Sequence, residues 1–475
     1  MEAIASFFKF AERGTTIGTE IRAGLTTFMV MAYIIFVNPS ILSSGPLEGA
    51  GPPFLAVAVG TALAAGILTI AMGLVTNYPF ALAAGLGLNA VVAFDLILGR
   101  GLLWQEAMAI IVWEGILITI LVITGLREAV MAAIPMNLKR AIAVGIGLFI
   151  LFIGLFNGGL VVDTFATPDA PAPPVDVGAI INVGVLTFVI GLGLTLALMA
   201  RRIRGALLIG ILATTLVAIV LNAIVGPAAS GFLPNTAVLP STVDGYIFNF
   251  RPENFAIIFE PLGHLVSVFT RPELAFLTVA LVIFSLMMAD FFDTMGTVIG
   301  VGEQAGLVDE QGRLPGIRNV LLVDSLGAVT GGAFGVSSNT TYIESAAGVS
   351  EGGRTGLTAV VVGLLFIVAI LFAPITGIVP PQATAPALVI VGFLMFRIAR
   401  EFEWGEIDLV FPALATAIVM PLTFSITDGI AAGFVSFGFL KLVTGRWREV
   451  HPLMWAASIA FAVYFAVPWL EVLLG

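Results

Sequence analysis

Residues 79–90 read "PFALAAGLGLNA", a stretch that is apolar but too short and too rich in glycine to cross a membrane as an ordinary helix. Glycine favours extended or broken backbone, which is tolerated at membrane depth only where it is buried in protein or lines a cavity. Residues 327–341, "GAVTGGAFGVSSNTT", have the same character. Two interrupted segments of this kind indicate a binding site near the middle of the bilayer.

The composition around these stretches is that of a polytopic α-helical membrane protein. The 475-residue chain is 59% hydrophobic and 11% charged, with a mean hydropathy of +1.10. Its continuous apolar runs of about 20 residues suit spanning helices, whereas the strands of membrane barrels alternate in short segments. No basic cluster suggests nucleic acid as a partner. The chain lacks cysteine, and we expect neither a cofactor nor a metal site.

The apolar runs predict an all-α protein with about fourteen transmembrane helices. A polar connection, residues 227–272, separates two series of seven. A last apolar stretch, 452–474, is either an extra span or an interfacial helix. The spans are expected near residues 20–38, 55–76, 85–98, 105–124, 138–156, 180–199 and 205–226, and then near 274–300, 317–333, 340–350, 355–374, 384–400, 407–424 and 426–444.

The two series resemble each other in sequence. "GLGLNA" (85–90) matches "GVSSNT" (335–340) at an offset of 250 residues, and "VITGL" (122–126) matches "PITGI" (374–378) at an offset of 252. Because seven spans is an odd number, the two halves are inserted with opposite orientation, as in the inverted repeats of secondary transporters. The alternative is chance similarity between glycine-rich apolar helices.

The distribution of Lys and Arg predicts the orientation in the cell membrane. Positive residues collect in cytoplasmic loops, and the segments 39–54, 157–179 and 375–383 contain none. These three segments are therefore expected outside, and the N-terminus, with its basic residues up to Arg22, inside. We expect a multi-pass protein of the inner or plasma membrane.

Two aspartates interrupt the apolar run "SLMMADFFDTMGTVIG" at residues 285–300. Asp290 and Asp293 are three residues apart, so on a helix they project from the same side. Burial is costly for an ionised carboxylate, so at least one of them should be protonated or accept a hydrogen bond from a strong donor. We interpret Asp290 as a substrate-binding and proton-coupling group. Asp293 is a proton-coupling group or a structural brace, and a purely structural pair is the alternative for both.

Glu344 directly follows the second interrupted segment, in "SSNTTYIESAAGV". It is expected at the start of a half-helix, facing Asn89 of the other repeat across the crossing point. An amide and a carboxylate together offer a donor and acceptors for the edge of a flat heterocycle. We therefore predict substrate binding by Glu344 and Asn89, with proton coupling at Glu344 as well. The alternative for Glu344 is a capping residue.

Further residues near the two acids receive weaker interpretations. Phe291 and Phe292 are candidates for aromatic contacts with a planar ligand, although ordinary packing is the competing explanation. The backbone of the interrupted segments is expected beside the ligand. We interpret Asp95, Glu114 and Asp324 as structural or interfacial. The backbone candidates are Gly85, Gly87, Gly335, Ser337, Ser338, Asn339 and Thr340.

The motifs resemble those of the AzgA-like purine permeases, members of the nucleobase–ascorbate transporter superfamily. The resemblance extends over nearly the whole chain and is carried by "GTTIGTEIRAGLTTFMVMAYIIFVNPSIL" (14–42), "GLGLNA", "DFFDTMGT" (290–297) and "SSNTTYIESAAGVSEGGRTGLT" (337–358). The bacterial uracil permease is a more distant relative. One departure is Val91 and Val92, where many relatives have an aromatic residue after "GLGLNA", and it leaves the purine preference open.

The resemblance implies two inverted repeats divided into a core domain and a gate domain, with a short strand in spans 3 and 10. Such proteins import adenine, guanine or hypoxanthine with protons and often form homodimers through the gate domain. It implies that Asp290 and Glu344 contact the purine, that Asn89 assists and that Asp293 supports transport. The implied division is core 1–126 and 274–376, gate 127–226 and 377–475, and external connection 227–273.

The sequence thus predicts proton-coupled secondary active uptake of purine nucleobases by alternating access. An anion transporter of the same architecture is one alternative, although the acidic site argues against it. A passive nucleobase facilitator is the second alternative. Walker A, HExxH and Gly-x-Ser-x-Gly motifs are absent, so we do not expect an enzyme.

Overall fold

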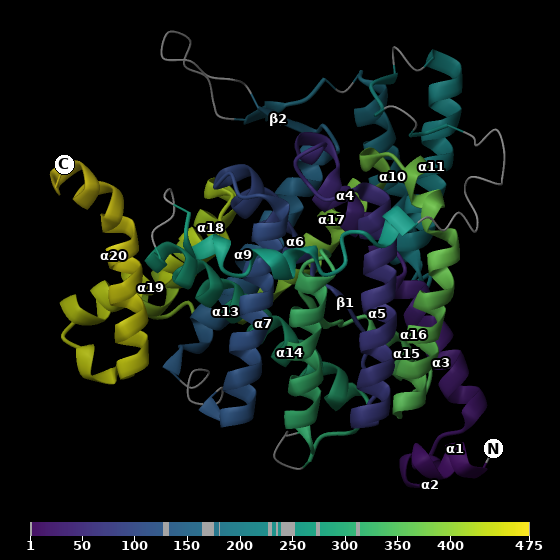
Figure 1. The fold of residues 1–475 in the computed structure, drawn as a ribbon, viewed down its shortest axis with the longest axis horizontal. Helices are drawn as coiled ribbons and strands as arrows, with labels where there is room; N and C mark the ends of the chain where they lie inside the picture. Colours follow the sequence, from purple (N-terminus) through teal and green to yellow (C-terminus); the bar gives the residue numbers. More distant parts are fainter. Residues whose placement is uncertain are drawn as a thin grey trace.

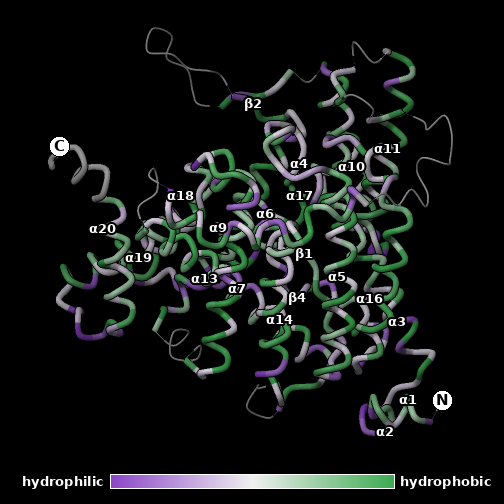
Figure 2. The backbone as a smooth tube through the Cα atoms, viewed as in Figure 1, coloured by the Kyte–Doolittle hydropathy of each residue, from purple (hydrophilic) through white to green (hydrophobic). Residues whose placement is uncertain are grey.

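A computed structural model describes residues 2–126, 133–163, 175–179, 181–226, 230–233, 236–238, 252–271, 276–309 and 314–474. The molecule is a block of long, mostly upright helices (Figure 1). Hydrophobic residues dominate these helices along their length (Figure 2). The N-terminal helices α1 and α2 lie at one end of the block and β2 at the other (Figure 1). This placement agrees with the predicted separation of residues 1–13 and 157–179 onto opposite sides.

The first half of the chain contains two interrupted spans. Ala32 and Tyr33 separate α3 from α4, and the third span consists of a strand, a short helix and a π-helix. The elements are α1 (Glu2–Phe7), α2 (Phe10–Arg13), α3 (Ile17–Met31), α4 (Ile34–Ser43), η1 (Gly45–Leu47), α5 (Phe54–Thr76), β1 (Leu82–Ala84), α6 (Leu86–Ala90), η2 (Val91–Gly99), α7 (Trp104–Thr124), α9 (Met136–Asn157), β2 (Val161–Asp163), β3 (Val175–Val177), α10 (Val183–Ala200) and α11 (Ala206–Val225).

The second half repeats the order of a long helix, a strand and a short helix. Three 3-10 turns precede it, η3 (Pro252–Phe255), η4 (Glu260–His264) and η5 (Ser267–Phe269). The elements that follow are α13 (Phe276–Gln304), α14 (Ile317–Ala333), β4 (Asn339–Thr341), α15 (Ser345–Ser350), α16 (Gly356–Ala369), η6 (Ile370–Ile378), α17 (Pro381–Phe396), η7 (Arg397–Glu401), α18 (Ile407–Thr423), α19 (Ile426–Val443), η8 (Trp447–Glu449) and α20 (Pro452–Leu474).

Equivalent helices of the two halves make equivalent contacts. Helix α5 packs against α16, and α14, its counterpart in the second half, packs against α7. Both interfaces depend on glycine: a Cβ atom at Gly73 would lie 2.3 Å from the Gly356 carbonyl oxygen, and one at Gly115 would lie 2.5 Å from the Val329 nitrogen. Small residues let membrane helices approach closely in this way. A second group is formed by α9, α17 and α18, with α10 and α11 packed together at its edge.

The two interrupted spans meet as a two-stranded antiparallel sheet. Strands β1 and β4 pair with Leu82 opposite Thr341 and Ala84 opposite Asn339. The Gly85 nitrogen extends the ladder by donating to the Ser338 carbonyl over 2.8 Å. All six strand residues are buried. The backbone groups left unpaired by broken helices therefore satisfy each other inside the protein, as membrane depth requires.

The prediction of an all-α polytopic membrane protein is confirmed. Ten helices in the described chain are long and apolar enough to span a bilayer, and shorter apolar helices cover 86–99, 407–423 and 452–466. The expected span at 340–350 is β4 followed by the six-residue helix α15. Residues 230–233, 236–238 and 252–271 of the predicted connection 227–272 are described, and the last of these ranges contains the 3-10 turns η3, η4 and η5.

The terminal stretch that the sequence leaves undecided forms helix α20, which packs along α19. The Ser458 hydroxyl donates to the Phe434 carbonyl over 2.9 Å, and the Tyr464 hydroxyl bonds the Asp428 carboxylate at the same distance. These contacts join α20 to the helical body.

Candidate functional site

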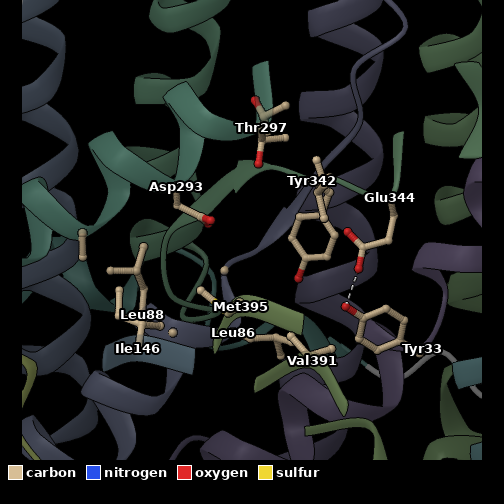
Figure 3. Close-up of a pocket in the computed structure, with 15 residues that line it drawn as sticks. Tyr33, Leu86, Leu88, Ile146, Asp293, Thr297, Tyr342, Glu344, Val391 and Met395 are labelled. Atoms are coloured by element: carbon tan, nitrogen blue, oxygen red, sulfur yellow. Dashed lines mark hydrogen bonds between the residues drawn. The ribbon is translucent and has the colours of Figure 1, made fainter. Parts of the chain in front are cut away.

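A cavity lies beside the strand pair, between the two groups of helices. It contains about 620 Å³ of space free of protein atoms, part of it open to solvent. The part of this space that the centre of a water molecule can occupy is about 100 Å³, which is smaller than the roughly 300–1,000 Å³ typical of small-molecule sites. Its walls come from distant parts of the chain, namely Tyr33, residues 85–88, Ile146, one face of α13, residues 341–344, Val391 and Met395 (Figure 3). The predicted location of a site at the interrupted spans therefore coincides with a real cavity.

Helix α13 presents one row of side chains to this cavity. Ala289, Asp293 and Thr297 line it, and their spacing of four residues places them on one helical face. Asp293 points into the same space as Glu344 and Tyr342 (Figure 3). Asp290 is 1% exposed and is absent from the lining. Of the two predicted aspartates, the one interpreted as supporting therefore lies at the cavity.

Glu344 lines the cavity as the sequence suggests, but it does not cap a helix. It occupies the N-cap position of α15 without a capping hydrogen bond from its side chain. Its Oε1 atom instead accepts a hydrogen bond from the Tyr33 hydroxyl over 2.8 Å (Figure 3). The Tyr33 hydroxyl of span 1 therefore orients this carboxylate at the cavity wall.

Asn89 lies in α6, directly behind the cavity-lining residues Gly85 to Leu88. It is fully buried, and neither atom of its amide has a hydrogen-bond partner in the described chain. A buried, unsatisfied amide is costly. The amide is thus close to the cavity and chemically available, although it is not part of the lining.

The predicted aromatic contacts lie elsewhere. Phe291 is 1% exposed within the apolar core. The Phe292 ring lies 5.9 Å from the Lys139 ammonium, and neither ring lines the cavity. The aromatic side chains at the cavity are Tyr33 and Tyr342, which the sequence reasoning did not select. Both occur inside the quoted motifs "MAYIIFVNP" and "NTTYIES", which was the available signal.

The backbone candidates of the interrupted segments divide into two sets. Gly85 and Gly87 line the cavity. The others shape β4 and the turn before it, where Gly335 and Ser337 have positive φ angles of 72° and 69°. Helix α14 makes room for this turn, because a Cβ atom at Gly331 would lie 2.0 Å from the Ser337 carbonyl oxygen. The remaining backbone candidates in the turn and strand, all buried, are Ser338, Asn339 and Thr340.

Asp324 on α14 holds the strand in place. Its Oδ1 accepts from the Thr341 nitrogen over 2.9 Å and from the Thr341 hydroxyl over 2.8 Å, and its Oδ2 accepts from the Thr294 hydroxyl over 2.7 Å. Three elements, α13, α14 and β4, are joined through one buried carboxylate. This geometry agrees with the structural interpretation of Asp324.

The cavity combines acceptors with an apolar floor. Carboxylates of Asp293 and Glu344 and the hydroxyl of Thr297 stand above Leu86, Leu88, Ile146, Val391 and Met395 (Figure 3). Such a surface suits a flat ligand whose edge carries N–H donors and whose faces are apolar. Among the described residues, no group of His, Cys, Asp and Glu is arranged to hold a metal ion.

The sequence matches the Permease family over residues 18–432. The adenine permease AdeP of Escherichia coli (strain K12) is 41% identical over 454 residues, covering 96% of this chain and 94% of the relative. The guanine/hypoxanthine permease PbuO of Bacillus subtilis (strain 168) is 39% identical over 464 residues, covering 97% and 99%.

Solved structures with the same fold are far less similar in sequence. The transmembrane domain of the cyanobacterial bicarbonate transporter BicA superposes with a TM-score of 0.61 at 15% identity, covering 88% of this chain and 97% of that domain. The inward-facing anion transporter Slc26a9 of mouse gives a TM-score of 0.57 at 11% identity, covering 90% and 69%. At these identities the likeness concerns the fold alone.

Proposed function

The chain belongs to the Permease family, and from this premise we propose that it imports purine nucleobases by proton-coupled secondary active transport. It is a membrane permease and not an enzyme. The resemblance to AzgA-like permeases is confirmed by the match to this family. The cargo class is supported by relatives of about 40% identity named for adenine and for guanine and hypoxanthine.

The observation that carries the proposal is the pairing of Asp293 and Glu344 across the cavity. A purine has ring and exocyclic N–H donors along its edge, and two carboxylates supply acceptors for them. The apolar floor accommodates the ring faces. Asn89 and Asp290, which are buried and lie outside the lining, enter the proposal as groups that contact the ligand when the site closes.

Proton coupling follows from the same acids. A buried carboxylate beside another carboxylate is destabilised in its charged form. Binding of a proton together with the purine removes this repulsion and lets the loaded site move. We propose that Asp290, Asp293 and Glu344 share this role.

The movement that we propose divides the protein into a core and a gate. The core comprises spans 1–4 and 8–11 and carries the strands, and the gate comprises spans 5–7 and 12–14. The groups of helices packed around α5 with α16 and around α9 with α17 support this division. Their equivalent contacts support two inverted repeats of seven spans, with α20 added at the end. A homodimer through the gate remains a prediction that mass photometry in nanodiscs checks.

The test is uptake of radiolabelled adenine, guanine and hypoxanthine into proteoliposomes with an inward proton gradient. We expect accumulation above equilibrium, competition by unlabelled purines and collapse with a protonophore. Uptake that ignores the gradient would make the protein a facilitator and remove the proton role. Accumulation of bicarbonate or another anion without purine uptake would favour the anion alternative, which the fold permits but the acidic cavity disfavours.

A further inference from the structure

A buried carboxylate outside the cavity has no role in the proposal so far. Glu114 lies in the middle of α7 and is fully buried. Neither of its carboxyl oxygens has a hydrogen-bond partner in the described part of the chain. Its electrostatic neighbours are Asp290 on α13 and Asp324 on α14. An uncompensated ionised carboxylate in such surroundings is very costly, so Glu114 holds a proton in this conformation.

The other charged groups on elements packed against α7 lie too far along the helix to compensate Glu114. Glu106 pairs with Arg271 over 2.6 Å, and Gln105 bonds Glu260 of η4. Both contacts occur near the first turn of α7, eight or nine residues before Glu114, which is about 12–14 Å at a rise of 1.5 Å per residue.

Among the remaining titratable groups on these elements, Arg318 of α14 donates to the Ile123 carbonyl of α7 over 2.8 Å, nine residues after Glu114, and Asp293 of α13 lines the cavity. Asp95 of η2 pairs with Arg100 over 2.8 Å. The Nδ1 atom of His264 in η4 lies 3.4 Å from the Ser267 hydroxyl of η5.

The two acids facing Glu114 differ in what holds them. Asp324 accepts three hydrogen bonds from Thr294 and Thr341, an arrangement that suits an ionised carboxylate, which accepts but does not donate. The Asp324 carboxylate is therefore already engaged in hydrogen bonds with strand β4 and helix α13. Asp290 lies on the helix that also carries Asp293, three residues further and at the cavity. Glu114 thus has Asp290 as an electrostatic neighbour, and Asp290 shares α13 with the cavity-lining Asp293.

Resting on the proposed proton-coupled function, we propose that Glu114 is a second proton-binding residue of the transport cycle and exchanges its proton with Asp290. The proton leaves a Glu114 carboxyl oxygen and bonds to an Asp290 carboxylate oxygen, so the negative charge moves from Asp290 to Glu114 and total charge is unchanged. When the site is empty the proton resides on Glu114. When a purine binds, the proton moves from Glu114 to Asp290.

The experiment compares two modes of transport in the full-length protein. Gradient-driven accumulation needs protonation and deprotonation, whereas exchange of labelled for unlabelled purine across the membrane needs only movement of the loaded site. In Glu114→Gln, which keeps the size of a protonated glutamate but cannot release a proton, we expect exchange within about twofold of wild type and accumulation lowered about tenfold or more, a loss of about 1.4 kcal/mol of driving force.

Glu106→Gln is the matched control, because it neutralises another buried glutamate of the same helix that is paired with a cation. We expect it to retain gradient-driven accumulation per folded molecule. Normal accumulation by Glu114→Gln would overturn the inference, as would loss of both modes in a preparation that elutes as one folded species.

If Glu114→Gln does not fold, Glu114→Asp decides the question. It retains a carboxyl but withdraws it by one methylene, so the pH profile of accumulation should shift while exchange is maintained. An unchanged pH profile overturns the proposal. Wild-type protein is measured first: if it does not accumulate purine with the gradient, the proposed function itself fails, and that result is distinct from a failure specific to Glu114.

Discussion

Asp408 and Glu114 are both fully buried acids in membrane-spanning helices, yet their surroundings are opposite. Asp408, at the start of α18, lies 3.1 Å from the Lys441 ammonium and 2.5 Å from the Arg446 guanidinium. Glu114 instead has the acids Asp290 and Asp324 as its electrostatic neighbours, and its carboxyl oxygens have no hydrogen-bond partner among the described residues. Lys441 also contacts Glu449 over 2.8 Å, so the Asp408 group extends into a network that reaches the protein surface.

The contrast separates two uses of a buried carboxylate. A pair with well-placed cations holds helices together, and breaking it leaves an unpaired charge. An acid kept among acids stabilises nothing, and such groups in membrane proteins mark ligand and proton pathways. Substitution should therefore damage stability at Asp408 and damage transport at the acidic group around Asp290.

The largest effect is expected for Asp408→Asn on stability. It leaves Lys441 buried with its charge only partly compensated, and removing one partner of a buried ion pair costs about 3–5 kcal/mol, with the lower end applicable where a surface partner remains. Thermal unfolding in detergent measures the effect. An unchanged melting temperature of Asp408→Asn would contradict the claim that the Asp408 ion pairs stabilise the fold.

Asp290→Asn should have the second-largest effect, and on transport. Loss of a charged hydrogen-bonding group is worth about 1.5–3 kcal/mol, which corresponds to a decrease in kcat/KM of about 10- to 100-fold. The melting temperature should fall less than that of Asp408→Asn, in which a buried cation loses its partner. Uptake assays and unfolding on the same preparation check both parts. An Asp290→Asn protein that transports normally would contradict the role of this acid.

Tyr33→Phe should give a smaller change. It removes the hydroxyl that donates to Glu344 over 2.8 Å, and a typical hydrogen bond contributes about 0.5–1.5 kcal/mol. We expect KM for purine to rise about two- to tenfold with a smaller change in kcat, because Glu344 loses its orientation. Tyr78→Phe is a matched control, since the Tyr78 hydroxyl bonds the Pro315 carbonyl away from the cavity. An equal effect of both substitutions would indicate general destabilisation.

The smallest effect is expected at the contact between the third span and α19. The Ser425 hydroxyl donates to Asp95 over 2.9 Å, but Asp95 keeps its ion pair with Arg100 in Ser425→Ala. We expect a loss of stability of about 1 kcal/mol or less and unimpaired purine binding. Binding calorimetry and thermal unfolding measure the two quantities. A loss of binding comparable with that of Asp290→Asn would show that compensated acids also govern the cargo site.

Much of the fold is determined by local sequence properties. Apolar runs of spanning length define the long helices, and the glycine-rich stretches 79–90 and 327–341 each contain a break in the backbone, although residues 327–333 still belong to α14. The short-range motifs "GLGLNA" and "NTTYIES" also identified the neighbourhood of the cavity. Glu344 was predicted and lies in its lining.

Tertiary structure determined which acids line the cavity and which are paired with cations. Residues three apart lie about 60° from each other around the helix axis, so the rotation of α13 against its neighbours sets whether Asp290 or Asp293 reaches the cavity. The partner of Glu344 is Tyr33, more than three hundred residues away. A cation reaches Asp408 from the end of α19, whereas the electrostatic neighbours of Glu114 are the acids Asp290 and Asp324. Burial and charge pairing depend on long-range packing, which no local pattern encodes.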